Sequence, residues 1–373
     1  MNCSPNRVSV DLSALVDNLN QVRNLLSPGT RIMGVVKSDA YGHGILPVSK
    51  VLEVNGVDCL GVAHLEEALD LRKNGIRCPI VILCGIQTGE GAREVIDKDL
   101  TPVLFDLETA GLLADECSRT GKKVRVQLKV DTGMGRLGIP HSDVAHFLRK
   151  MSEYKNIYLE GLTSHLSCAD EIANDFTGRQ IDIFKRAIET VRAMGVELPL
   201  NSLANSAGVM GCMDSHFDLV RPGIMLYGGR PSPEFSSLLR LKPVMHFRGR
   251  VLQVRDLPDQ TPVSYGRTYY TKGPSKLAIV SAGYGDGIPR RLSNTGKVLV
   301  KGRKCDIIGR VCMNLMVSDV TGLKGVVAGD EVVFLGTQGD EMSTGDDMAR
   351  WGETISYEIF CSIGQRHTRE YVP

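Results

Sequence analysis

The sequence predicts an α/β fold, an N-terminal (β/α)8 TIM-like barrel, followed by a C-terminal mostly-β domain. Over about the first 235 residues, apolar β-branched runs alternate with helical patterns, whereas short alternating segments with glycine-bearing turns fill the rest. Strands that alternate with helices are typical of right-handed βαβ units and a parallel sheet. A length of 373 residues is also more than one ordinary core accommodates, which favours two domains.

The expected barrel begins after a strand-like RVSVDL and a helical pattern over 12–26. β-Branched runs then recur at 31–37, 59–63, 79–84, 102–105, 123–130, 157–162, 199–203 and 217–221. Most gaps between them hold helical patterns, such as one whose apolar face comprises Ile181, Phe184, Ile188 and Val191. Eight strands in about 200 residues suit a closed barrel better than an open sheet.

The second domain is expected where this rhythm stops. Segments such as KVLV, DIIGRV, LMVSDV and DEVVFLG follow one another with glycine turns between them, which is an all-β pattern. We therefore place the barrel domain at 1–240 and the β domain at 241–373, and we allow the first strand to pair with the second domain.

Charge and cysteine usage exclude several classes of protein. Lysine and arginine total 44 against 43 aspartate and glutamate, a net charge of +1 that argues against a general nucleic-acid binder. The ten cysteines form no C-x-x-C pair and no disulfide framework, which is typical of a reducing compartment. Neither a signal peptide nor a membrane span is evident. The composition indicates a cytoplasmic protein without a membrane partner.

Lys37 is the first candidate for chemistry, because it ends an apolar run at the point where a barrel strand should open onto the functional face. Desolvation lowers the pKa of an ammonium group and frees its lone pair for Schiff-base chemistry. A lysine just past a strand can equally be a solvated surface residue. The polar, glycine-bearing string Ser38–Gly44 that follows favours the functional interpretation.

The string VVKSDAYGHG closely resembles the pyridoxal-phosphate lysine motif of alanine racemases. Further motifs similar to that family follow in the family's order: KVDTGMGRLG, SHLSCAD, NSAG, RPGIMLYG, SYGRTY, AGYGDG, GRVCMN and SYEIFCSIGQR. Nine motifs in order along nearly the whole chain make coincidence implausible. The family's fold, a barrel plus a β domain, agrees with the pattern described above.

The resemblance implies that Lys37 binds pyridoxal 5'-phosphate covalently and is one of two catalytic bases, and that Tyr265 is the other. Racemisation removes the α-proton from one face and returns a proton to the other, so two groups must flank the reacting carbon. A free phenol has a pKa of about 10, so a cationic hydrogen-bond network must stabilise its anion. His165 resembles the family histidine of that network.

Arg221 resembles the arginine that faces the pyridine nitrogen of the cofactor. A guanidinium only donates hydrogen bonds, so the ring nitrogen has to accept and stays unprotonated. An unprotonated ring is a weak electron sink, which limits side reactions such as transamination. Decarboxylases and aminotransferases commonly place a carboxylate there, so arginine favours racemase chemistry.

The remaining assignments also rest on the resemblance. The residues implied for phosphate binding are Tyr41, Ser206, Gly223, Ile224 and Tyr357. Arg136 and the backbone N–H of Met313 are implied for the substrate carboxylate, and Lys129 occupies a position that is carbamylated in some relatives. The chain departs from the family at Asn314, where relatives usually have aspartate, so one negative charge near the mouth of the site is lost.

We therefore expect a pyridoxal-phosphate-dependent racemase that interconverts L- and D-alanine for peptidoglycan synthesis. Head-to-tail homodimers are expected, in which Tyr265 completes the partner's site. A racemase that prefers serine or several amino acids, a decarboxylase with a similar barrel and a non-catalytic pyridoxal-phosphate carrier are the alternatives. The SYGRTY motif and the β domain argue against the last two.

Overall fold

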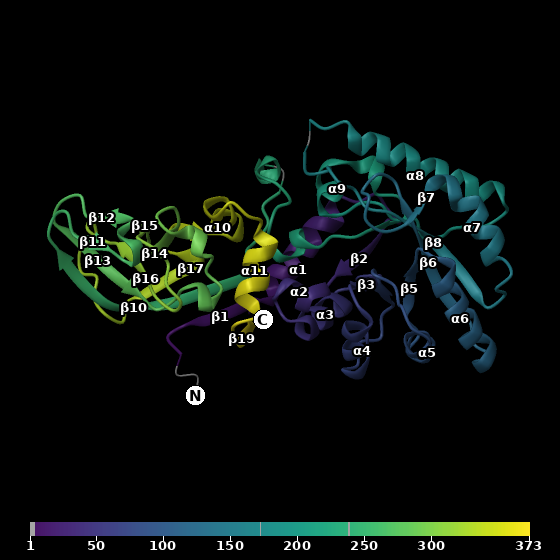
Figure 1. Ribbon diagram of the computed structural model, residues 1–373, viewed down its shortest axis with the longest axis horizontal. Coiled ribbons are helices and arrows are strands. Elements are labelled where there is room, and N and C mark those ends of the chain that lie inside the picture. Colours follow the sequence, from purple (N-terminus) through teal and green to yellow (C-terminus); the bar gives the residue numbers. More distant parts are fainter. Residues whose placement is uncertain (1–3, 172, 238) are drawn as a thin grey trace.

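A computed structural model of the protein describes residues 4–171, 173–237 and 239–373, and it has two lobes (Figure 1). The first lobe is built on the parallel strands β2 (Arg31–Val35), β3 (Cys59–Val62), β4 (Ile80–Ile82), β5 (Thr101–Leu104), β6 (Val124–Asp131), β8 (Ile157–Thr163) and β9 (Leu219–Val220). They neighbour one another in the order β9-β2-β3-β4-β5-β6-β8, and the short β7 (Ile139–Pro140) also pairs with β6. These strands match seven of the eight predicted runs.

The eighth side of the barrel is the extended segment 200–204, between β8 and β9. Ser202 exchanges backbone hydrogen bonds with β8 (Ser202 N to Leu162 O and Ser164 N to Ser202 O, both 2.9 Å), and Arg221 N donates to Ala204 O (3.0 Å) on the other side. The barrel is therefore closed, as the sequence predicts. The segment is irregular because the side-chain amide of Asn201 accepts the N–H of Leu162, which a ladder carbonyl would otherwise accept.

Helices surround this wall (Figure 1). Their bounds are α1 (Leu12–Asn24), α3 (Ile45–Val54), α4 (Leu65–Lys73), α5 (Gly89–Asp97), α6 (Leu107–Thr120), α7 (Val144–Met151), α8 (Phe176–Ala193) and α9 (Ser206–Gly211). The predicted apolar face of α8 is confirmed, since Ile181, Phe184, Ile188 and Val191 are all buried. None of the helices in the described part of the chain is both long and apolar enough to cross a bilayer.

The second lobe is a smaller barrel of antiparallel strands. Its members are β10 (Met245–Leu257), β13 (Ser275–Val280), β14 (Lys297–Val300), β15 (Arg303–Ile308), β16 (Met316–Asp319) and β17 (Glu331–Gln338). They follow the order β17-β14-β15-β16-β13-β10, and β17 pairs back onto β10. The ribbon of β11 (Pro262–Val263) and β12 (Tyr269–Tyr270) projects from it, and β18 (Glu341–Ser343) pairs with β17.

The all-β expectation is wrong for residues 345–364, which form α10 (Gly345–Gly352) and α11 (Ser356–Gly364). α10 begins with a capping box: Thr344 Oγ1 accepts the N–H of Asp347 (3.0 Å), and the Asp347 carboxylate accepts the N–H of Thr344 (3.1 Å). Two helices of nine residues or fewer carry too little periodicity to stand out among strands.

The first strand belongs to the second lobe. β1 (Arg7–Asp11) lies between β10, with which it is antiparallel, and β19 (Arg369–Val372), with which it is parallel. The Asp11 side chain then caps α1 by accepting the N–H of Ala14 (2.9 Å). The chain therefore crosses to the first lobe immediately after β1.

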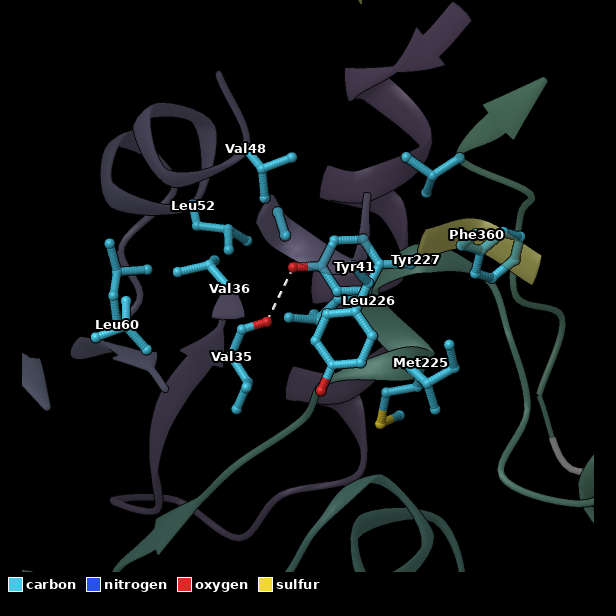
Figure 2. Close-up of a cluster of buried hydrophobic side chains, with 14 of the residues drawn as sticks. Val35, Val36, Tyr41, Val48, Leu52, Leu60, Met225, Leu226, Tyr227 and Phe360 are labelled. Atoms are coloured by element: carbon cyan, nitrogen blue, oxygen red, sulfur yellow. Dashed lines mark hydrogen bonds between the residues drawn. The ribbon is translucent and has the colours of Figure 1, made fainter. Parts of the chain in front are cut away.

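The core beneath the end of β2 is drawn in Figure 2. The ring of Tyr227 lies against that of Tyr41, with centroids 4.9 Å apart, and its hydroxyl donates to the backbone carbonyl of Val35 (2.9 Å). Phe360 of α11 packs at the same cluster. The end of β2, two residues before Lys37, therefore packs on these aromatic rings.

Candidate active site

A cavity of about 420 Å³ opens at the carboxyl ends of the parallel strands, within the size range of roughly 300–1,000 Å³ typical of small-molecule sites. Ten predicted site residues line it: Lys37, Tyr41, Lys129, Arg136, His165, Ser206, Arg221, Gly223, Ile224 and Tyr357. They come from strands, helices and loops far apart in the sequence, and Tyr357 lies on α11 (Ser356–Gly364) of the second lobe. The barrel gathers the other nine at the face where the fold places functional groups.

Lys37 and Tyr41 are the two ends of α2 (Lys37–Tyr41), a single turn of left-handed helix. Ser38, Asp39, Ala40 and Tyr41 have φ of 54°, 54°, 53° and 55°. L-Residues pay roughly 1–2 kcal/mol each for this conformation. Such strain persists only where surrounding contacts impose it, and it is typical of functional sites. The left-handed turn brings both side chains into one cavity.

The amine of Lys37 lies in an environment that disfavours its charged form. Burial, and then the charge of the nearby Arg136 guanidinium, lower the pKa of Lys37. A larger fraction of the amine is therefore neutral near pH 7 than for a lysine in water. A neutral amine is the form that attacks a carbonyl or accepts a proton.

Arg221 is buried just after the end of β9 and determines the protonation and tautomer of His165. Its guanidinium donates to Ser202 Oγ and to the Ser164 carbonyl, and it lies 3.3 Å from His165 Nδ1. Because arginine has no acceptor, Nδ1 must be the accepting nitrogen. Burial and the positive charge of Arg221 hold the pKa of His165 well below its usual range, so the ring is neutral, with its proton on Nε2. Burial also lowers the pKa of Arg221, to about 10, but leaves it charged at pH 7.

Lys129 lies in the same cavity. Burial, followed by the charges of Arg221 and Arg136, puts the pKa of Lys129 well below the usual value. A neutral amine is the form that reacts with carbon dioxide, so carbamylation of Lys129 stays a prediction that this environment favours.

The polar groups at one end of the cavity suit a phosphate. Ser206 Oγ accepts the N–H of Gly223 (2.9 Å), and a Cβ on Gly223 would lie 2.4 Å from the hydroxyl of Tyr41. Only glycine therefore lets backbone and phenol approach this closely. Burial raises the pKa of Tyr41, and that of Tyr357 likewise, so both keep their hydroxyl protons and act as donors. Hydroxyl and backbone N–H donors of this kind bind phosphate dianions.

Tyr265 and Met313 are the two predicted residues that the chain does not bring to its own cavity. Their exposed fractions are 71% and 58%. Tyr265 lies between β11 and β12, at the end of the second lobe that Figure 1 shows farthest from the first lobe. Within one chain, these residues face outward.

Asn314 compensates in part for the aspartate usual in the family. Its side-chain amide donates to the carboxylate of Asp286 (3.1 Å), so a negative charge remains next to this position. An aspartate at 314 would place two carboxylates against each other, which is unfavourable. The amide of Asn314 instead donates a hydrogen bond to the Asp286 carboxylate.

Sequence reasoning missed several residues of the cavity wall: Leu83, Cys84, Val103, Leu137, Thr163 and Asn205. Most of them lie at or just after the carboxyl end of a barrel strand. That position alone could have selected them, since the C-terminal face of such a barrel carries the site.

Comparison with known proteins gives one family for both lobes. Residues 10–231 match "Alanine racemase, N-terminal domain" and residues 244–371 match "Alanine racemase, C-terminal domain". The chain is 42% identical over 369 residues to alanine racemase 2 of Caldanaerobacter subterraneus subsp. tengcongensis, with 99% of this chain and 95% of that protein covered.

Solved structures agree with this result. Alanine racemase from the D-cycloserine producer Streptomyces lavendulae superposes with a TM-score of 0.93 at 35% identity, covering 100% of this chain and 98% of that one. Alanine racemase from Bartonella henselae, with covalently bound pyridoxal phosphate, has a TM-score of 0.88 at 30% identity, with coverage of 98% and 99%.

Proposed function

Because the chain belongs to the alanine racemase family, we propose that it interconverts L-alanine and D-alanine with pyridoxal 5'-phosphate and so supplies D-alanine for peptidoglycan. The observation that carries this proposal is one cavity. It is lined by Lys37, whose pKa is lowered, by hydrogen-bond donors suited to a phosphate, and by Arg221. The free cysteines of the described chain suit a cytoplasmic enzyme.

The residues of the cavity fit this cofactor. Lys37 would hold it covalently, the donors around Gly223 would hold its phosphate, and Arg221 would donate to its ring nitrogen. When bound, pyridoxal phosphate withdraws electrons from the α-carbon of an amino acid and makes its α-proton more acidic. Since Arg221 stays protonated and can only donate, that withdrawal is moderate, which suits proton exchange without further chemistry.

Two bases on opposite faces would move the α-proton. The amine of Lys37 accepts or returns a proton on one face, and the phenol of Tyr265 does so on the other. The Nε2–H of the neutral His165 would donate a hydrogen bond to Tyr265 Oη. The positive charge of Arg221, next to Nδ1 of the same ring, would strengthen this donor. This arrangement lowers the free energy of the phenolate.

Tyr265 can reach a cavity only if a second copy supplies it. We therefore propose a head-to-tail homodimer in which the β11–β12 end of one chain closes the cavity of the other. The exposure of Tyr265 and Met313 supports this arrangement, as does the solvent exposure of Arg136 at the cavity rim. Arg136 and the backbone N–H of the partner's Met313 would then bind the substrate carboxylate.

The experiment that tests the function follows proton exchange. Purified protein with L-alanine in deuterium oxide should exchange the α-proton and produce D-alanine, both read by NMR and chiral chromatography. A panel of L-amino acids under the same conditions separates an alanine racemase from a serine or broad-specificity racemase. Yellow cofactor absorbance without exchange would identify a pyridoxal-phosphate carrier and contradict the proposal.

Arg221→Glu should change the reaction that the site favours. A carboxylate at this position stabilises a protonated ring nitrogen and makes the cofactor a stronger electron sink. We expect slower racemisation and an increased ratio of pyruvate formed by transamination to D-alanine formed. Arg221→Lys, which keeps a cationic donor, is the control. An unchanged product ratio in the glutamate variant would contradict the contact with the ring nitrogen.

A further inference from the structure

Residues of the second lobe hold the left-handed turn that carries Lys37. One guanidinium nitrogen of Arg369, on β19, donates to Asp39 Oδ2 and to the backbone carbonyl of Gly42 (3.0 Å). The other carboxylate oxygen of Asp39 accepts the N–H of Ile45 (2.7 Å). Arg369 thus bridges the middle and the end of the turn from outside the barrel.

The position of Arg369 is set by strand pairing and is largely shielded from water. Its side chain is 19% exposed, against 35% for Asp39. β19 is fixed by its parallel register with β1, in which Val8 lies opposite Arg369. Tyr371 lies two residues along and so on the same face of β19, and its hydroxyl reaches the segment just after the turn: a Cβ on Gly44 would lie 2.0 Å from it. β19 therefore contacts the turn through Arg369 and the residues just after the turn through Tyr371.

The first half of the turn is held from the barrel side instead. Glu67 accepts the N–H of Ser38 (2.6 Å) with one oxygen, and with the other it accepts the N–H groups of Ala63 (2.7 Å) and His64 (3.2 Å). These bonds anchor the start of the turn to α4. Glu67 therefore holds the start of the turn, and Arg369 holds its second half.

We infer that Arg369 is a positioning residue of the active site, which keeps residues 38–42 left-handed and thereby keeps Lys37 and Tyr41 directed into the cavity. Four consecutive non-glycine residues with positive φ need such external contacts, because the right-handed alternative is intrinsically favoured. The contact joins the second lobe to the lysine within one chain. Its catalytic consequence rests on the proposed role of Lys37, whereas the contact itself does not.

Hydrogen exchange on the full-length protein tests the inference. In Arg369→Met, amides in the peptide covering 37–45 should exchange faster by between about ten- and a hundredfold, the range that corresponds to a lost hydrogen bond to a charged group. Arg369→Lys, which keeps the charge but not the fork of donors, should fall between this variant and the wild type. Arg366→Met is the matched control, since the Arg366 side chain is exposed and donates to the Ser362 carbonyl, away from the turn.

Asp39→Asn tests the same contact from the barrel side and leaves β19 intact. It should accelerate exchange in 37–45 as well. Adding it to Arg369→Met should have little further effect, because Arg369→Met already removes the ion-pair partner of Asp39. Steady-state racemisation by Arg369→Met should show kcat reduced about tenfold or more with a smaller change in KM.

Three results would overturn the inference. The first is wild-type exchange in 37–45 of Arg369→Met. The second is acceleration spread equally over all peptides of the second lobe, which would make Arg369 a general stabiliser. The third is accelerated exchange with an unchanged kcat. Failure of the proposed function is distinguishable from all three, because it would appear in the wild type as absence of racemisation.

Discussion

Lys37→Ala is expected to abolish racemisation and covalent cofactor binding together. The rate should fall by roughly 10⁴-fold or more, the upper end for loss of one acid–base group, because covalent attachment is lost as well. D-Alanine formation and the visible absorbance of the lysine-bound cofactor measure the two effects. Lys50→Ala, at an exposed position of α3, is the control and should behave as wild type.

A second lysine in the same cavity is an alternative to Lys37 for attaching the cofactor. Lys129 is also buried enough to have a strongly lowered pKa, so its amine is chemically able to attach the cofactor. Borohydride reduction followed by peptide mapping separates the two lysines. Cofactor found on Lys129, or on any peptide without Lys37, would show that the assignment is wrong.

Tyr265→Phe is expected to affect the two directions of the reaction unequally. Removal of the hydroxyl leaves no base on one face, so abstraction of the α-proton from L-alanine should slow by about 10²–10⁴. Exchange from D-alanine, which Lys37 serves, should be less affected. Proton exchange from each enantiomer in deuterium oxide measures both. Tyr270→Phe is the matched control, since Tyr270 lies on the same ribbon and is also exposed. Equal retention of both exchanges would exclude Tyr265 as a base.

Mixing two inactive variants tests where Tyr265 acts. Lys37→Ala and Tyr265→Ala subunits, allowed to exchange, should form heterodimers with one intact pair of bases and recover up to about half of one dimer's activity. Sites completed within one chain predict no recovery. Verified heterodimers without activity would contradict the shared site.

Much of the fold is predictable because its pattern is local. β-Branched runs mark the barrel strands, and KVLV coincides with β14. The sequence predicts a strand at 199–203, yet the side-chain amide oxygen of Asn201 replaces one backbone acceptor there, which no hydropathy pattern reveals. The helices α10 and α11 are too short for their periodicity to stand out, although the capping box at Thr344 was readable.

Some features of the candidate site are likewise predictable from local sequence, and others depend on tertiary contacts. Motifs point to Lys37, Arg221 and the proposed phosphate donors, and the structure brings these residues to one cavity. The left-handed turn at 38–41 is not predictable, since it contains no glycine and depends on Glu67 and Arg369. Likewise, the proximity of Asn314 to Asp286 arises from tertiary packing between two loops. Contacts between distant segments determine what local sequence cannot.

The placement of β1 has a mechanical consequence. The chain passes between the lobes twice, after Asp11 and before Met245, and these crossings are hydrogen-bonded to each other through Asp11 N and Val244 O (2.8 Å). A single linker permits rotation about every axis, whereas two hydrogen-bonded crossings side by side resist twisting and bend mainly in one direction. Together with the bonds from Arg369 to Asp39 and Gly42, the two crossings hold the lobes in one orientation. In the proposed homodimer, Tyr265 would therefore meet the second copy at a fixed angle.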